Sequence, residues 1–243
     1  MDWRENGVLL SARKHGETAM IIEVLTRGHG LHAGVVQGGA SRKMAPVLQP
    51  GAELDLAWRA RLSEHIGSIR AEPVRSRAHL MENRLTLAAR NATAALLTFS
   101  LAEREAHPDL YDKTVALLDM IGEGPVWPLA YLRWEMNLLE ELGFGLDLSC
   151  CATTGATEGL AYVSPRTGRA VSEAGSGIWK DRLLPLSPDL LSTGKGTPDG
   201  VLQGLRVTGH FFEHHLAPSL GTKPLPPARQ RFIDALGRLS VGE

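Results

Sequence analysis

The sequence changes its pattern near residue 75, and this change limits the folds that the chain can adopt. Before it, short stretches rich in apolar and β-branched residues alternate with glycines and basic residues, which is typical of β-strands joined by tight turns. After it, apolar residues recur mainly at helical spacing. The sequence therefore predicts an α+β protein, with a small β-barrel domain over residues 1–76 and a helical domain over residues 77–243.

Strands are expected at five places in the first part, and turn residues separate most of them. The strands are predicted over residues 7–13, 19–26, 31–37, 53–58 and 66–74, whereas residues 40–49 have no clean period. Five short strands within about 70 residues fit a Greek-key barrel of the OB type. An SH3-like barrel has a similar strand count, so the pattern alone leaves both open.

The second part is predicted to be helical with one β-hairpin insert. Helices are expected over residues 80–101 (as one or two helices), 109–121, 128–142, 198–216 and 227–239. The insert is expected around residues 144–177, with its two strands at 160–164 and 169–172.

Composition and cysteine content lead us to expect a protein of a reducing compartment. Among 243 residues, 43% are hydrophobic, and no stretch approaches the roughly 18 consecutive apolar residues of a membrane span. The first six residues carry charges of both signs and have no apolar core, so we expect no export signal. The two cysteines, Cys150 and Cys151, are adjacent and poorly placed to bridge each other, which favours a cytoplasmic protein with reduced thiols.

The sequence lacks the motifs of common enzyme classes, so we expect no catalytic activity. There is no P-loop, no dinucleotide-binding GxGxxG after a strand, no HExxH and no GxSxG. His210 and His214 have the i, i+4 spacing of metal ligands, with His215 beside them, but no carboxylate motif accompanies them. Surface or partly buried histidines explain this group more simply than a metal-dependent enzyme does.

The segment from Cys150 to Gly155 has the form of an incomplete zinc knuckle. Cys151 would be the first thiolate, but Thr154 stands at the second position and Ser172 lies where a later cysteine pair would belong. A structural zinc site needs four ligands. The segment is therefore predicted to be a zinc-ribbon-like loop that folds without zinc, or else an ordinary loop with two incidental thiols.

Positive charge is concentrated in the predicted barrel, although the whole chain has a net charge of −1. Residues 1–77 contain eleven Lys and Arg against eight Asp and Glu. Such cations could contact nucleic-acid phosphates, or they could simply lie in solvent on the barrel surface with no ligand. Aromatic side chains are scarce there, with Trp3 and Trp58 as the candidates, which favours contact with the backbone over base stacking. Eight of these basic residues are the candidates considered for phosphate contact: Arg13, Lys14, Arg27, Arg42, Lys43, Arg59, Arg61 and Arg70.

A second candidate site lies on the predicted helix over residues 128–142. Arg133 lies near Leu132 and Met136, an i, i+4 apolar pair. An arginine beside apolar side chains can anchor a short acidic peptide with an apolar end. More often, such an arginine only extends along the helix surface with no partner.

The order of these parts resembles the RecO family of bacterial recombination mediators, and the resemblance covers nearly the whole chain. In the first half it rests on GVLL (7–10), GET (16–18), IIEVLT (21–26), GHG (28–30), VVQGGA (35–40) and LQPG (48–51). In the second half it rests on RWE (133–135), LLEELG (138–143) and LDLS (146–149) followed by Cys151.

The resemblance implies an N-terminal OB domain and a helical domain with a zinc-finger-like insert. It implies binding to single- and double-stranded DNA and annealing of complementary strands. It also implies partnership with RecR and with the acidic C-terminal tail of single-stranded DNA-binding protein, which together help to load RecA. Many members of the family hold zinc with two cysteine pairs. Here Cys151, with Cys150 adjacent, is what remains of them, so we expect neither zinc nor another cofactor.

These observations lead to the hypothesis of a non-enzymatic recombination mediator in the cytoplasm, associated with the nucleoid and not with a membrane. A protein-interaction adaptor, with a structural barrel and little intrinsic DNA binding, is the alternative. Arg133 is the residue expected to bind a partner protein. Phosphate contacts are expected from Lys14, Arg27, Arg42, Lys43, Arg59 and Arg61.

Overall fold

A computed structural model describes residues 1–62, 65–191, 193–221 and 223–240. Their internal contacts group them into two compact units, Met1–Asp119 and Met120–Glu243. The expected domain boundary near residue 76 stays a prediction. Among the described residues, no helix is both long enough and apolar enough to cross a membrane.

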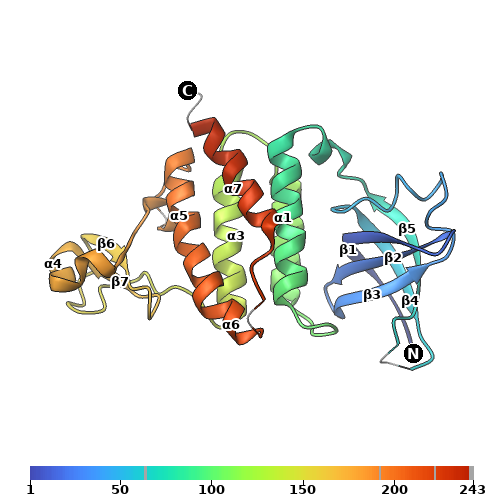
Figure 1. Cartoon of the computed structure of the whole chain (residues 1–243), viewed down its shortest axis with the longest axis horizontal. Helices are drawn as coiled ribbons and strands as arrows, with labels where there is room; N and C mark the ends of the chain where they lie inside the picture. The colour runs from blue at the N-terminus through green and yellow to red at the C-terminus, as the bar shows by residue number, and fades with distance from the viewer. Residues whose placement is uncertain (63–64, 192, 222, 241–243) are drawn as a thin grey trace. The chain divides into compact units, whose positions relative to one another are not determined.

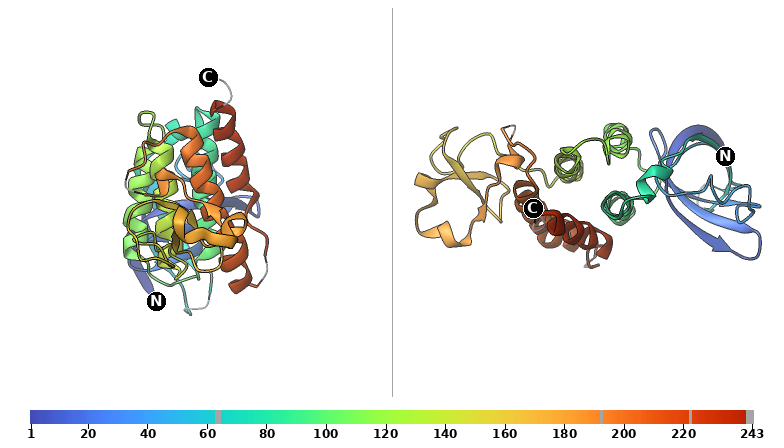
Figure 2. Two further views of the ribbon diagram at one scale, coloured as in Figure 1. Left: turned by 90° about the vertical axis from the view of Figure 1, so that its left-hand side faces the viewer. Right: turned by 90° about the horizontal axis from the view of Figure 1, so that it is seen from above.

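In the described part of the chain, five strands form a closed barrel at the start of the first unit (Figures 1 and 2). Their order around the barrel is β1-β2-β3-β5-β4, and β1 closes the barrel by pairing with both β2 and β4. This closed Greek-key arrangement confirms the predicted OB-type barrel. The strands are β1 (Asp2–His15), β2 (Ala19–Thr26), β3 (Gly30–Val36), β4 (Glu53–Arg59) and β5 (Ser68–Arg75).

Strand β1 begins earlier than the sequence pattern predicted. The expected strand started at Gly7, but residues Asp2–Asn6 also pair with β4. Their side chains are half-buried or exposed and are mostly charged or polar, so they give no apolar signal. Gly7 lies where β1 is paired on both sides, and a Cβ there would come within 2.6 Å of Leu56 Cδ1. A register shift between Leu9 and Ser11 bends β1 from one partner to the other.

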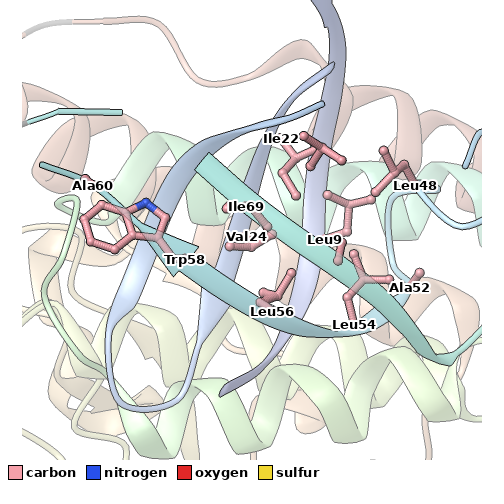
Figure 3. Packing of buried hydrophobic residues seen from close by; sticks show 12 residues of the cluster. Leu9, Ile22, Val24, Leu48, Ala52, Leu54, Leu56, Trp58, Ala60 and Ile69 are labelled. Atoms are coloured by element: carbon pink, nitrogen blue, oxygen red, sulfur yellow. The ribbon is translucent and has the colours of Figure 1, made fainter. Parts of the chain in front are cut away.

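The barrel core consists of apolar side chains that point inward from the five strands, with β3 contributing its last residue, Val36 (Figure 3). Part of the β3–β4 connection also packs into this core. Leu9, Ile22 and Val24 are fully buried, as are Leu54 and Leu56. They occupy alternating positions on β2 and β4, as expected for strands with one face inside a barrel. Leu48 and Ala52 close the core from the β3–β4 connection.

Two helices complete the first unit. After the 3-10 helix η1 (Ala78–Met81) come α1 (Arg84–Ser100) and α2 (Pro108–Met120). Asn83 caps α1, because its Oδ1 accepts a hydrogen bond from the backbone N–H of Leu85 at 2.7 Å. Arg77 is buried and donates to Gly51 O at 2.8 Å and to Asp119 Oδ1 at 2.7 Å, so it ties the barrel end to α2.

In the second unit, α5 packs against both α3 and α7, and the three helices lie side by side (Figures 1 and 2). Their bounds are α3 (Trp127–Glu141), α5 (Pro198–Phe211) and α7 (Pro227–Ser240). The helix expected over residues 198–216 changes at Phe212 into a π-helical turn, η4 (Phe212–Leu216), followed by α6 (Ala217–Ser219). The wider turn allows His210 Nε2 and His215 Nε2 to lie 3.2 and 2.8 Å from the same carbonyl oxygen, that of Pro165.

A buried ion pair joins the three helices. Glu135 of α3 is fully buried and accepts two hydrogen bonds from Arg229 of α7, both at 2.8 Å. Thr208 of α5 donates its hydroxyl to the same carboxylate at 2.5 Å. Burial alone would lower the pKa of Arg229, but the charge of Glu135 outweighs it and raises the pKa. Both charges are thus compensated inside the helical packing.

The predicted β-hairpin insert is present, and it has a third strand that the sequence did not predict. The sheet order is β7-β6-β8, with β6 (Leu160–Val163), β7 (Ala170–Ser172) and β8 (Leu184–Pro185). Strand β8 was missed because two residues, one of them proline, carry no periodic signal. The short helices α4 (Glu173–Ser176), η2 (Gly177–Arg182) and η3 (Pro188–Leu190) complete the insert and its return to α5.

In the segment that resembles a zinc knuckle, the sulfur of Cys151 is surrounded by hydrogen-bond donors. Cys151 is buried, and its Sγ accepts from the backbone N–H and the hydroxyl of Ser172 at 3.2 and 3.3 Å. Thr153 Oγ1 lies 3.2 Å from the same sulfur. Burial alone would raise the pKa of the Cys151 thiol, but these hydrogen bonds outweigh it and lower the pKa. The neighbouring side-chain donors are hydroxyls, so these residues do not fit the four nitrogen or sulfur ligands of structural zinc.

Loss of the buried carboxylate should destabilise the helical packing. We expect Glu135→Ala to lower the free energy of unfolding by about 3–5 kcal/mol, because Arg229 would be left buried without its counter-charge. Urea denaturation followed by circular dichroism measures this. The control is Arg169→Ala, which removes an exposed pair with Asp147 and should cost less than about 1 kcal/mol. Equal losses in the two variants would contradict the assigned role.

Loss of the Cys151 sulfur should weaken the insert without any involvement of metal. We expect Cys151→Ala to lower the free energy of unfolding by about 1–3 kcal/mol, because the Ser172 N–H would lose its acceptor in a buried place. Cys150→Ala, at the adjacent and less buried thiol, should have little effect. Dialysis against EDTA should leave the urea midpoint unchanged; a midpoint that falls after EDTA would show that a metal supports the fold.

Candidate nucleic-acid interface

A cleft opens in the barrel wall where strands β3 and β5 meet. These strands share a short parallel pairing of Val35 with Ser68, and the backbone N–H of Val35 donates to Gly67 O at 3.0 Å. The other neighbouring strands of the barrel pair through seven or more residues each. The resulting cleft has a volume of about 880 Å³, within the range of ligand sites in proteins.

Three cations line this cleft. They are Lys43 from the β3–β4 connection, Arg59 at the end of β4 and Arg70 on β5. All three side chains belong to exposed residues, and Arg70 forms an exposed pair with Glu72 at 3.1 Å. In the part of the chain that the structure describes, Lys43 and Arg59 have no ion-pair partner. Their charges therefore face solvent at the cleft and can meet an anion.

The β3–β4 connection brings Lys43 to the cleft through a run of tight turns. The backbone N–H of Ala45 donates to Ser41 O at 3.0 Å, and that of Leu48 donates to Met44 O at 2.9 Å. Each acceptor lies four residues before its donor. These turns place Met44 and Val47 against the barrel core and leave Arg42 and Lys43 exposed. The i, i+3, i+4 spacing of Met44, Val47 and Leu48 is the sequence signal that could have revealed this arrangement.

The six cations predicted to contact phosphates are thus divided between different places. Lys43 and Arg59 line the cleft, and Arg42 is the chain neighbour of Lys43. Lys14 lies near the end of β1, opposite Met20, and Arg61 is exposed in the β4–β5 connection. Arg27, in the β2–β3 turn, pairs with Asp112 at 3.1 Å. Their role in DNA binding stays a prediction.

Arg70 belongs to the cleft, although it was not among the residues predicted to contact phosphate. Its exposed position between the buried Ile69 and Ala71 follows from the alternation of β5. Other arginines of the barrel unit are already paired with carboxylates. Arg4 pairs with Asp55, and Arg75 and Arg77 pair with Asp119. Burial acts to raise the pKa of Asp119, but hydrogen bonds from Arg77 and Arg75 outweigh it and lower the pKa.

The two tryptophans of the barrel do not form an open stacking platform. Trp3 and Trp58 face each other in the β1–β4 register, and their rings stack with centroids 5.9 Å apart. His29 stacks on the other side of Trp3 at 4.6 Å. Trp58 is buried, so these rings serve barrel packing.

Arg133 on α3 is engaged within the second unit. Its guanidinium donates to Leu190 O at 2.9 Å and to Leu191 O. Burial lowers the pKa of Arg133, although Asp189 acts in the opposite direction. The residue holds the end of η3 against α3, and its predicted role in partner binding stays a prediction.

The histidines at the end of α5 make backbone contacts. Besides the two that approach Pro165, His214 Nδ1 lies 3.1 Å from His210 O. Burial and the neighbouring histidines lower the pKa of His210. Within the described residues, no group of three or more His, Cys, Asp or Glu side chains could hold a metal ion.

Both halves of the chain match known protein families, and the two matches point to the same family. The family model described as "Recombination protein O N terminal" matches residues 1–77, and that described as "Recombination protein O C terminal" matches residues 81–224. Among similar proteins named DNA repair protein RecO, that of Ruegeria sp. (strain TM1040) is 58% identical over 98% of this chain and 99% of its own length. The RecO of Dinoroseobacter shibae is 60% identical over 98% and 99%, and that of Jannaschia sp. (strain CCS1) is 61% identical over 98% and 97%. The chain therefore belongs to the RecO family of DNA repair proteins.

Proposed function

We propose that this protein is a recombination mediator that binds single- and double-stranded DNA and anneals complementary strands. The observation that carries the proposal is the meeting of Lys43, Arg59 and Arg70 around the β3–β5 cleft of an OB barrel. A phosphate backbone that passes the cleft would exchange its bound counterions for these side chains. Two strands held in one positive field repel each other less, which favours pairing of their bases.

The proposed mediator has no catalytic step of its own and works in the cytoplasm in association with the nucleoid. With RecR as its partner, it would help to load RecA onto DNA that single-stranded DNA-binding protein covers. Membership of the RecO family supports this role. The exposed charges of the cleft supply the DNA contact that such a role requires.

Reversal of charge in the cleft should weaken DNA binding and reduce its dependence on salt. We expect the double variant Lys43→Glu and Arg59→Glu to raise the Kd for a fluorescent single-stranded oligonucleotide at least tenfold, because two phosphate contacts become repulsive (about 1.4 kcal/mol per factor of ten). The slope of log K against log salt should flatten by roughly 1.4. Fluorescence anisotropy across a salt series measures both quantities.

The charge-matched control is the double variant Arg166→Glu and Arg206→Glu, at exposed arginines in the β6–β7 turn and on α5. If this variant weakens binding as much as the cleft variant does, the effect reflects net charge and not the cleft. If the wild-type protein fails to bind DNA at low salt, the adaptor hypothesis replaces the mediator.

The tail of single-stranded DNA-binding protein is proposed to bind near Arg133. Its acidic, apolar-ended chemistry suits an arginine beside apolar side chains. We expect Arg133→Ala to weaken binding of a labelled acidic peptide about tenfold, because a charge-assisted hydrogen bond is lost. The control is Arg206→Ala, an exposed arginine on α5. Unchanged peptide binding by a folded Arg133→Ala variant would contradict the proposed site. The role of Arg133 would then be structural, through its hydrogen bonds to Leu190 and Leu191.

A further inference from the structure

We propose that the β3–β5 cleft takes unpaired bases on an apolar floor formed by Met44, Val47 and Ile69, and so selects single-stranded over double-stranded nucleic acid. This inference rests on the proposed DNA binding. The bases would contact the apolar floor, whereas the phosphates would contact the cations of the cleft lining.

The cleft combines charge at its lining with an apolar floor. Met44 and Val47 are partly buried and pack on the barrel core, and Ile69 is 4% exposed. All three line the cleft together with Lys43 and Arg59. Glu72 also lies in the lining, where it pairs with Arg70, so the unpaired positive charge comes from Lys43 and Arg59. A ligand that carries negative charge and apolar surface side by side would complement these residues.

Single-stranded nucleic acid has this chemistry and a duplex does not. An unpaired base exposes its flat apolar faces next to a charged phosphate. In a duplex the bases stack on each other inside the helix, so phosphates and sugars would meet the apolar floor and lose water without compensation. The floor therefore favours an unpaired strand.

The side chains of the floor suit bases of any identity. The thioether of Met44 is flexible and polarisable, and a sulfur atom makes favourable contacts with aromatic rings. Within the described part of the cleft lining there is no aromatic side chain. A base would thus rest on sulfur and branched aliphatic groups, and this contact does not depend on hydrogen bonds that differ between bases.

Oxidation of methionine in the wild-type protein tests the inference without any substitution. Hydrogen peroxide converts Met44 to the sulfoxide, and mass spectrometry of its peptide gives the rate. A saturating single-stranded oligonucleotide should slow this rate several-fold, whereas a saturating duplex should leave it unchanged. Met81, which is 40% exposed on η1, is the internal control and should oxidise at one rate throughout. Equal protection of Met44 by both ligands, or by neither, would overturn the inference.

A pair of variants gives an independent test. Met44→Ser should raise the Kd for a single strand about five- to tenfold through the loss of apolar contact, and should leave the Kd for a duplex unchanged. Met44→Leu keeps apolar volume and should restore single-strand binding. Equal weakening for both ligands would overturn the inference but leave DNA binding intact. A wild-type protein that binds neither ligand would instead overturn the proposed function.

Discussion

The architecture of the barrel unit depends on the long strand β1, whose two halves pair with different neighbours. Its first half pairs with β4 and its second half with β2, so β1 closes the ring of strands. The close approach at Gly7 and the shift after Leu9 make this double pairing sterically acceptable. The junction of β3 with β5 is short by contrast, and the cleft opens at this junction.

The same closure explains how a chain with a net charge of −1 can present a local positive field. Arginines on β1 and β5 that lie near carboxylates are neutralised, as in the pairs of Arg4 with Asp55 and of Arg75 with Asp119. Among the unpaired cations of the described residues, Arg59 stands where β4 ends and Lys43 lies in the β3–β4 connection, so both reach the cleft. Local geometry, more than total charge, therefore decides where an anion can bind.

The sequence predicts those parts of the fold that local pattern determines. Strand β2 was predicted with the bounds that the structure has, since apolar residues fill most of its length. The start of β1 and strand β8 were missed because charged residues or a proline hide the pattern. Lys43 and Arg59 could be named as candidates from composition. Their convergence with Arg70 could not, because it follows from strand register and from the turns at residues 41–48. Local pattern also drew attention to Arg133, which has apolar neighbours in the sequence. It could not reveal the role of Glu135, because its partner Arg229 is 94 positions away.

The pairing of Glu135 with Arg229 also has a consequence for the order in which the second unit can form. The two residues are 94 positions apart, and the insert lies between them in the sequence. Contacts that close long loops form late, because the entropy of closure must be overcome first. Until α7 has been synthesised and has docked, the carboxylate on α3 needs water, so α3 and α5 can associate only loosely. The helical unit should therefore acquire its tight packing in one late step, and an incomplete chain would expose the apolar faces of α3 and α5 to chaperones and proteases.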